Sequence, residues 1–474
     1  ASATGVSTSN ALSLTSGATM SAAGAVGSVQ AVGGSVTAAT TTNTITNAIN
    51  TVDDLEDSSM RTTANAVTSA ATGATATNSL STTSATNNLS VATNTGTVKN
   101  SVAGTGSGAD QYSVTAGQAL TNDQSMAAAA VVSAETEDNQ ILTQAGEDVT
   151  DSTVVTDSNS MSASATANSA DNGILLSFNN LVGPASATGT GVIAATANEQ
   201  TLADNATVKA RVVGRSGVPI LTTVDNDVQG SSVSTSGNTV SASARGNVTS
   251  GNDVVVDATN ITSGSEAAPS TFESNGDQTT TGSFVAASTQ LSGADILASQ
   301  RDSATTPTTS NTIRTDVDNN IEQSSTVVSD DNVLSAVATA NSANNAVQLG
   351  DANTATVKAS GTVANYQATA TAGSVTAEIG ITGSDPIKAF TSSNTAGVLT
   401  GNITDNGGDS FTNNGALLTY TFGTALTSEE RTALIAAGFQ NVSGSTADFV
   451  SGGTINASGL VGLTFSTGTD TLVN

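Results

Sequence analysis

The chain has 474 residues, of which 37% are hydrophobic but only 3% aromatic, and it contains no cysteine and no histidine. It has 39 acidic residues against 11 Lys and Arg, so its formal net charge is -28. The missing His and Cys exclude catalytic triads, thiolate chemistry and the usual zinc sites. The acidic balance argues against nucleic acid as a partner, because phosphate contacts need clustered Lys and Arg.

The apolar residues are mostly Ala and Val, which bury little area each. A chain of this composition must gain stability from many small repeated contacts and from backbone hydrogen bonds, which favours long strand ladders over a large globular core. No apolar run is long enough to span a bilayer, so we expect no membrane insertion. The chain opens with ASATGVSTSN, which we interpret as a mature N-terminus after signal-peptide removal from an exported prokaryotic protein.

We divide the chain into three parts. Residues 1–57 are predicted to be an N-terminal strand-rich segment or cap, residues 58–395 a β-strand repeat region, and residues 396–474 a C-terminal cap or docking module. Acidic residues cluster at 52–57 and 134–139, but neither cluster has a recognisable catalytic context. We interpret both as solvated loops.

The repeat region contains four similar segments with an asparagine at the start and another nine residues later. The clearest copy is NSMSASATANSADN, and a weaker copy, NSLSTTSATNNLSV, precedes it. The spacing of the copies indicates a loose period of roughly 80 to 95 residues. The paired asparagines are Asn78 and Asn87, Asn159 and Asn168, Asn238 and Asn247, and Asn332 and Asn341.

Side chains alternate strictly within each copy. From Ser160 to Ala167, Met161 and three alanines fall on one face, and serines and a threonine fall on the other. A period of two is typical of a β-strand, and Ser, Thr, Val and Asn are poor helix formers. The asparagines that bound each strand, Asn168 and Asn172 among them, are predicted turn residues.

These features predict an all-β, elongated, repetitive β-solenoid, with about four coils of roughly 20 residues in each repeat. The alternative is a tandem array of small β-sandwich domains. Stacked coils suit the composition better, because they form a thin core from small side chains.

Calcium is the only metal ion that the sequence suggests, since Asp, Asn and backbone carbonyls supply hard oxygen ligands. Two Asx-rich segments, residues 224–230 and 315–320, are the candidates, and an ordinary polar turn is the alternative for both. Neither segment matches an EF-hand loop. No other cofactor is expected. The candidate ligands are Asp225, Asp227, Asp316 and Asp318.

The C-terminal module differs from the rest of the chain. It has a dense apolar strand, from Ala416 to Phe422, followed by a predicted short helix near 428–437. Thr427 can cap this helix together with Glu430, and Gly438 can end it. The fold class is therefore all-β with a small α+β C-terminal cap.

With its NxxSAxAxxN repeat and no Cys or His, the chain resembles the repetitive β-strand surface proteins of alphaproteobacteria, among them the β-helical holdfast-anchor component of stalked bacteria. The resemblance covers roughly residues 60 to 360 and implies an extracellular adhesion or anchoring role with no active site.

We therefore expect an extracellular structural protein and not an enzyme. It would be a subunit of a self-assembling surface filament, matrix fibre or coat, with copies of itself, and cell-surface polysaccharide as a second candidate, as partners. The alternative function is a carbohydrate-binding or carbohydrate-cleaving β-helix, although Tyr112, Tyr366 and Tyr420 are the only tyrosines available as sugar platforms.

Overall fold

The computed structural model describes most of the chain between residues 1 and 379 and shorter segments after that. The described residues are 1–49, 54–84, 88–91, 98–100, 112–114, 116–182, 192–262, 272–274, 278–280, 283–301, 311–350, 356–370, 372–379, 410–413, 417–421, 431–432, 434–435, 439–444, 446–450, 465–467 and 470–472. Among these residues, no helix is both long enough and apolar enough to cross a bilayer.

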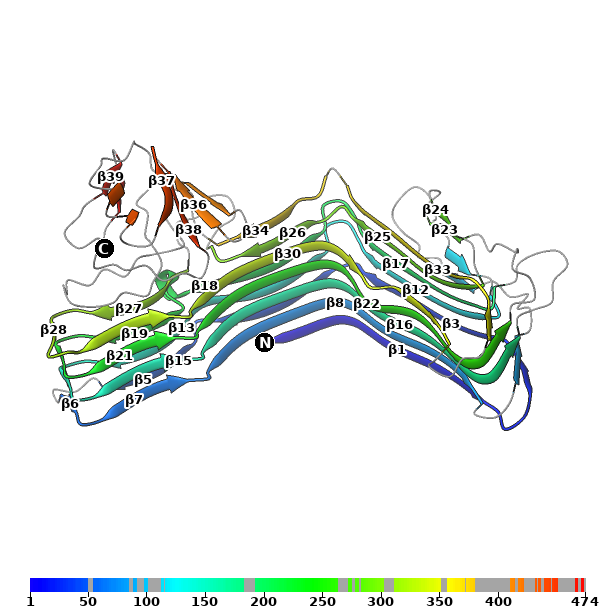
Figure 1. Cartoon of the computed structure of the whole chain (residues 1–474), viewed down its shortest axis with the longest axis horizontal. Helices are drawn as coiled ribbons and strands as arrows, with labels where there is room; N and C mark the ends of the chain where they lie inside the picture. The colour runs from blue at the N-terminus through cyan, green and yellow to red at the C-terminus, as the bar shows by residue number, and fades with distance from the viewer. Residues whose placement is uncertain are drawn as a thin grey trace.

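The described chain is almost entirely β, and its main sheets are parallel. It runs through the same set of sheets again and again, and we call each circuit a pass (Figure 1). The second pass is representative. It consists of β12 (Gln118–Met126), β13 (Val131–Ala145), β14 (Val149–Thr150), β15 (Thr153–Asp157) and the long strand β16 (Ser160–Val182).

The other passes follow the same order. The first consists of β3 (Gly24–Val32), β4 (Ser35–Thr41), β5 (Thr44–Ile49), β6 (Leu55–Glu56), β7 (Ser59–Thr63), β8 (Ala66–Thr83) and β9 (Asn88–Val91). The third consists of β17 (Ala194–Leu202), β18 (Thr207–Gly214), the 3-10 turn η1 (Arg215–Gly217), β19 (Ile220–Val224), β20 (Val228–Gln229), β21 (Ser232–Ser236) and β22 (Thr239–Thr262). The fourth consists of β25 (Phe284–Ser292), β26 (Asp295–Ser299), β27 (Ile313–Val317), β28 (Ile321–Glu322), β29 (Thr326–Asp330), β30 (Val333–Ala343), β31 (Ala346–Leu349) and β32 (Thr356–Lys358).

Partial passes lie at the two ends of the stack. Before the first pass come β1 (Ser2–Thr15) and β2 (Met20–Ala22), and after the fourth come β33 (Gly361–Thr369) and β34 (Val375–Glu378). The long strands form one layer in the order β1-β8-β16-β22-β30. The opposite layer contains the sheet β3-β12-β17-β25-β33 and the sheet built around β13.

Each repeat makes one pass. Ser160 lies opposite Ala66 on one side and Thr239 on the other, and the asparagines before these residues are 94 and 79 residues apart in the chain. The prediction of four coils of about 20 residues in each repeat is therefore wrong. Strands β1 to β5, within residues 1–57, pair in these same sheets.

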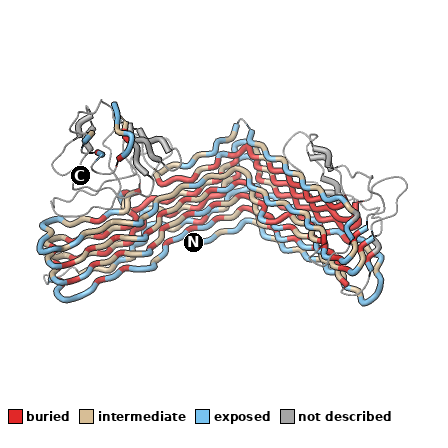
Figure 2. Tube along the Cα trace, viewed as in Figure 1, coloured by how far each residue is buried: buried red, intermediate tan, exposed pale blue. Residues whose placement is uncertain are grey.

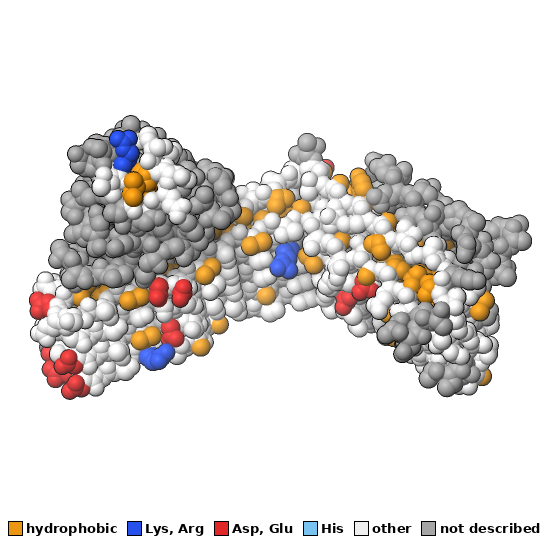
Figure 3. Space-filling view, in the orientation of Figure 1, with side chains coloured by type: hydrophobic (Ala, Val, Ile, Leu, Met, Phe, Trp, Pro, Cys, Tyr) orange, Lys and Arg blue, Asp and Glu red, His pale blue; other side chains and the backbone are white. Residues whose placement is uncertain are grey.

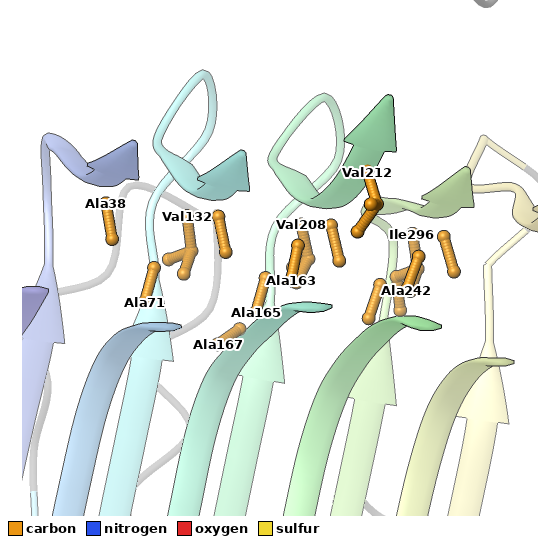
Figure 4. Close-up of a cluster of buried hydrophobic side chains, with 14 of the residues drawn as sticks. Ala38, Ala71, Val132, Ala163, Ala165, Ala167, Val208, Val212, Ala242 and Ile296 are labelled. Carbon is orange, nitrogen blue, oxygen red and sulfur yellow. The ribbon is translucent and has the colours of Figure 1, made fainter. Parts of the chain in front are cut away.

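The predicted alternation is confirmed. Met161, Ala163, Ala165 and Ala167 are buried, and the residues between them face outward. Strands β8 and β22 show the same alternation of buried residues with less buried ones (Figure 2). The inner alanines pack against larger side chains of the opposite layer, such as Val132, so small and large residues interdigitate across the core (Figure 4).

Both layers bend near the middle of the molecule (Figure 1). The alternation of β16 changes phase there, because Ala167 and Asn168 are buried in succession. Strand β8 shows the same phase change, where Gly73 fits because a Cβ would lie 2.6 Å from the carbonyl oxygen of Ala167. Asn168 and Asn172 thus lie inside a strand, and their prediction as turn residues is wrong.

The C-terminal region is a separate set of antiparallel strands. Within the predicted helix, residues 431–432 and 434–435 are helical, whereas Thr427, Glu430 and Gly438 lie outside the described residues. Leu434 and Phe439 are buried. The strands are β35 (Ser410–Asn413), β36 (Leu417–Thr421), β37 (Gln440–Ser443), β38 (Thr446–Val450), β39 (Phe465–Thr467) and β40 (Asp470–Leu472). Two further hairpins pair β10 (Val98–Asn100) with β11 (Tyr112–Val114) and β23 (Phe272–Ser274) with β24 (Gln278–Thr280).

Candidate functional site

The asparagine that starts each repeat stands at the corner before a long strand. The residue preceding it takes a left-handed conformation, with φ of 56° at Ser158 and 62° at Gly237. This conformation turns the chain sharply into the strand. The same corner recurs in each of the four passes, so the asparagines are stacked on one another.

The stacked amides form a ladder. The backbone N–H and Nδ2 of Asn159 both donate to Oδ1 of Asn238, each at 3.0 Å. Asn238 donates in the same way to Asn332, and Asn65 to Asn159. The remaining Nδ2 hydrogen of Asn159 reaches the Thr62 carbonyl at 2.9 Å. We call this set of four residues the corner ladder.

A second asparagine ladder lies at the bend. Asn168 donates through Nδ2 to Asn247 at 2.9 Å, and Asn247 donates to Asn341 at the same distance. Asn247 and Asn341 also donate across the core to the carbonyls of Leu291 and Ala368, both at 2.9 Å. These three residues, the bend ladder, tie β16, β22 and β30 to the opposite layer.

A buried glutamine ladder faces the bend ladder from the opposite layer. Each glutamine donates Nε2 to Oε1 of the preceding one at 2.6 or 2.7 Å, and four of them also donate to a carbonyl of the long strand. The two layers therefore hold the bend through reciprocal amide–carbonyl bonds. The residues are Gln30, Gln124, Gln200, Gln290 and Gln367.

The sequence did not reveal this glutamine ladder. Its members are spaced by 94, 76, 90 and 77 residues, and their flanking residues differ. A single Gln at irregular spacing carries no motif. The available signal was the period itself, since four of the glutamines lie 45 to 52 residues before the long-strand residue whose carbonyl they contact.

The structure places Asn78 in a different ladder from the one its motif predicts. Asn78 lies opposite Asn172, whose place in the chain is 13 residues after Asn159. Asn10 donates to Asn78 and Asn78 to Asn172, both at 2.9 Å, while Asn252 donates to Asn345. The residue of the first pass opposite Asn159 is Asn65. Asn87 lies outside the described residues.

Hydroxyl groups form a fifth chain of hydrogen bonds at the far end of the passes. Thr143 and Thr156 are joined by a hydrogen bond of 2.6 Å, and Thr222 bonds both Thr156 and Thr235. Thr62 and Thr315 extend the chain at its two ends. A hydroxyl both donates and accepts, so the interior of this arm needs no charged group to satisfy its polar atoms.

The ladders fix register more than they add stability. One such bond contributes about 0.5–1.5 kcal/mol net, whereas a buried amide left without its partner costs about 1–3 kcal/mol. A slip of one residue would separate every ladder amide from its partner and would turn inner side chains outward. The stacked amides therefore specify one alignment of successive passes.

The two calcium candidates lie side by side, because β19 pairs with β27. Three of the four candidate carboxylates accept hydrogen bonds. Asp225 accepts from Gln144 at 2.8 Å, Asp227 from the Asn320 N–H at 2.9 Å, and Asp316 from Arg314 Nε at 2.7 Å. The Asp318 N–H donates to the Val224 carbonyl at 3.0 Å.

Among the described residues, no group of three or more Asp and Glu side chains is arranged to hold a metal ion. The stacking also accounts for the pattern that suggested calcium. Asp and Asn residues recur in both segments because they form hydrogen bonds with each other. Calcium binding at Asp225, Asp227, Asp316 and Asp318 stays a prediction.

The acidic cluster at 134–139 is ion-paired with the next pass. Glu135 lies 2.7 Å from Lys209 Nζ and 3.4 Å from Arg211, and Glu137 also pairs with Arg211. Burial alone would raise the pKa of Glu135, but the hydrogen bond and charge of Lys209, with the charge of Arg211, outweigh it and lower the pKa. These carboxylates therefore serve as structural partners of neighbouring cations.

One surface carboxylate is destabilised. Burial and the negative charge of Asp171 raise the pKa of Asp253, although backbone hydrogen bonds at Asn252 and Ala346 oppose this shift. Asp253 lies on the outer side of β22, opposite Gly173 of the preceding pass.

No family model, no curated protein and no solved structure matches this chain. The assignment of function therefore depends on the arrangement described above.

Proposed function

We propose that the protein is a structural subunit with a β-solenoid fold, which assembles into a surface filament, matrix fibre or coat with an adhesion or anchoring role. The observation that carries the proposal is the in-register stacking of four passes on three asparagine ladders and a glutamine ladder. Tandem sandwich domains would pair strands within each repeat, whereas these strands pair between repeats.

The interior chemistry supports a structural role. The buried polar side chains in the ladders are amides and hydroxyls that bond to one another and to main-chain carbonyls. The carboxylates of the 134–139 cluster are neutralised by Lys209, Arg211 and Arg215. Stacked amides of this kind resist sliding and unzipping, which suits a protein that bears tension.

Extracellular placement forms part of the proposal, and the absence of Cys supports it because the chain has no thiol that an oxidising environment would modify. Copies of itself are the proposed partners, and cell-surface polysaccharide is a proposed further partner.

Negative-stain electron microscopy of the purified protein tests the proposal. We expect unbranched rods or filaments that lengthen as protein concentration increases. Compact monomers at every concentration, confirmed by light scattering, would contradict a self-assembling role.

A further inference from the structure

The two ends of the stack expose long strands without charged residues. Residues 1–52, which include β1, β3 and β4, contain no Asp, Glu, Lys or Arg, and neither do residues 332–350 and 359–377 at the other end. This is unexpected in a chain with a net charge of -28. Edge strands that must stay unpaired usually carry charges, prolines or bulges, and β1 and β30 carry neither charge nor proline.

The core is left uncovered at the end formed by the fourth pass. Val363 is 50% exposed and Val375 is 47% exposed. Yet the parallel register places both in line with fully buried residues of earlier passes, Ala286 and Ile296 respectively. These valines continue the rows of core residues, and among the described strands none pairs with the outer edge of β33 or β34.

The two ends have complementary shapes. Among the long strands, β1 extends one strand beyond β8, while β3, of the same pass as β8, ends the opposite layer. At the other end, β33 extends one strand beyond β25, while β30, of the same pass as β25, ends the long-strand layer. When one copy is stacked on another, the two ends match over the part of the stack that contains the long strands, where β1, β3 and β4 end three sheets and β30, β33 and β34 end the same sheets at the other side. The sheets of the far arm, which end at β27, β28 and β29, have one strand fewer, so they take no part in this contact.

The side chains match across such a junction. Following the register from strand to strand through the long-strand layer, Asn345 of one copy would face Asn10 of the next. Within the stack Asn10 donates to Asn78, Asn78 to Asn172 and Asn252 to Asn345, whereas Asn172 donates to Asn198 of the opposite layer. In the same direction, Asn345 would donate to the Oδ1 of Asn10. The same offset places Ala338 opposite Ala3, Val347 opposite Leu12, and Leu349 opposite Leu14.

The opposite layer matches in the same stacking. Val363 would face Val26 of the next copy, and Val375 would face Val36. Small residues therefore meet small ones, apolar residues meet apolar ones and an amide meets an amide along both layers. No charge is buried in these pairings.

We propose that copies of this chain assemble head to tail, with β1 of one copy adding as a parallel strand to β30 and β31 of the preceding copy. The partner is a second copy of the same chain, and the contact continues the ladders across the junction. This inference rests on the proposed structural function and specifies its interface. The contact is heterologous, so it propagates into an open filament.

Cysteine cross-linking tests the register, because the chain has no native cysteine. Ser13 and Gln348 are both exposed and would lie opposite each other at the junction. Parallel neighbours are about 4.8 Å apart, which suits a disulfide. Within one molecule these residues are four strands apart, which is about 19 Å, so only different copies can be linked.

The double variant Ser13→Cys, Gln348→Cys should give a ladder of disulfide-linked oligomers on non-reducing gels after mild oxidation. The matched control is Ser13→Cys with Val333→Cys. Val333 is also exposed on the edge of the fourth pass, but the position that it would face in the next copy lies before residue 1. The control should give at least tenfold less cross-linked product. Circular dichroism of both variants should match that of the natural chain.

A charge pair at the same positions gives a second readout without oxidation. Ser13→Lys with Gln348→Glu should assemble like the natural chain, whereas Ser13→Lys with Gln348→Lys should assemble less. Filaments that show no cross-link, or equal cross-linking in the control, would overturn this interface and leave the proposed function standing. Monomers alone in micrographs of the natural chain would overturn the proposed function and the interface together.

Discussion

The two halves of the long strands solve the same packing problem with different residues. Before the bend, β16 buries Ala163 and Ala165 against valines of the opposite layer. After the bend it buries Ile174, Leu176 and Phe178 in a core with larger side chains. The backbone pairing is parallel and in register through both halves. Strand pairing alone therefore does not set the thickness of the core, which follows from the side chains of each half.

The comparison teaches where each half is sensitive. In the alanine half, truncation removes little buried volume, whereas a larger side chain does not fit without strain. The leucine half obtains its stability from large buried groups, so it is sensitive to truncation. The amide ladders join the two halves and should be sensitive to loss of hydrogen bonds.

Truncation in the leucine half should have the largest effect. Leu176 is fully buried, so Leu176→Ala should lower the free energy of unfolding by about 2–5 kcal/mol. Leu175 is adjacent but 39% exposed, and Leu175→Ala should change it by less than about 0.5 kcal/mol. Denaturant unfolding of both variants measures the difference. Equal losses would show that the assignment of inner and outer faces is wrong.

Loss of an amide at the corner ladder comes next. Asn238→Ala leaves the two donors of Asn159 without an acceptor, and should cost about 1–3 kcal/mol. Asn65→Ala, at the end of the same ladder, removes donors but leaves no buried group unpaired, so its effect should be smaller. Chemical denaturation measures the free energy of unfolding of both variants. A larger loss for Asn65→Ala than for Asn238→Ala would contradict the proposed role of the ladder.

Enlargement should affect the alanine half by a similar or smaller amount. Ala165→Leu adds three carbons to a closely packed site and should cost about 1–3 kcal/mol. Ser164→Leu adds a similar side chain on the exposed face and serves as the control. Thermal unfolding followed by circular dichroism measures both. An unchanged melting temperature for Ala165→Leu would show that this half has spare volume.

The smallest effect concerns a surface carboxylate of the leucine half. The pKa of Asp253 is raised in the folded chain, so its protonated form is favoured there, and the folded state is destabilised as the pH rises through that pKa. Asp253→Asn should therefore raise the melting temperature at neutral pH. The gain should disappear as the pH falls below the ordinary value of 3.8. A gain that is independent of pH would contradict this explanation.

Glu135 gives the opposite pH dependence. Its pKa is lowered by Lys209 and Arg211, so it stabilises the fold above its ordinary value of 4.5, and this stability is lost as the pH falls through the lowered pKa. Glu135→Gln should therefore destabilise the protein at neutral pH and have little effect in acid. Thermal unfolding of the natural chain and of Glu135→Gln at neutral and at acid pH measures the loss of stability under each condition.

The alternation of residues 160–167 was sufficient to predict the strand and its inner face, because a period of two is a local property. The one-pass repeat was not predictable in the same way. Pairing partners are separated by 79 or 94 residues, and the corner asparagines resemble tight-turn signals that suggest shorter coils. In the first pass Ala74 stands opposite Asn168, so the two-asparagine motif is absent after Asn65 and is instead matched by the segment that starts at Asn78.

The candidate site was predictable only where a motif surrounds it. The corner and bend asparagines of the later passes stand in similar segments, whereas the glutamines and threonines of the other ladders have no shared neighbours. The stacking of Asp225 beside Asp318 depends on long-range pairing, which no local pattern of carboxylates reports.

The axial repeat of the assembled protein tests the central claim most directly. Each copy contributes five strands to the long-strand layer, from β1 to β30. At a strand spacing of about 4.8 Å, continued stacking predicts a subunit repeat of about 24 Å along the filament. Electron cryomicroscopy of filaments should therefore show layer lines at about 4.8 Å and about 24 Å. A filament with an unrelated subunit repeat, or strands running parallel to its axis, would contradict the account.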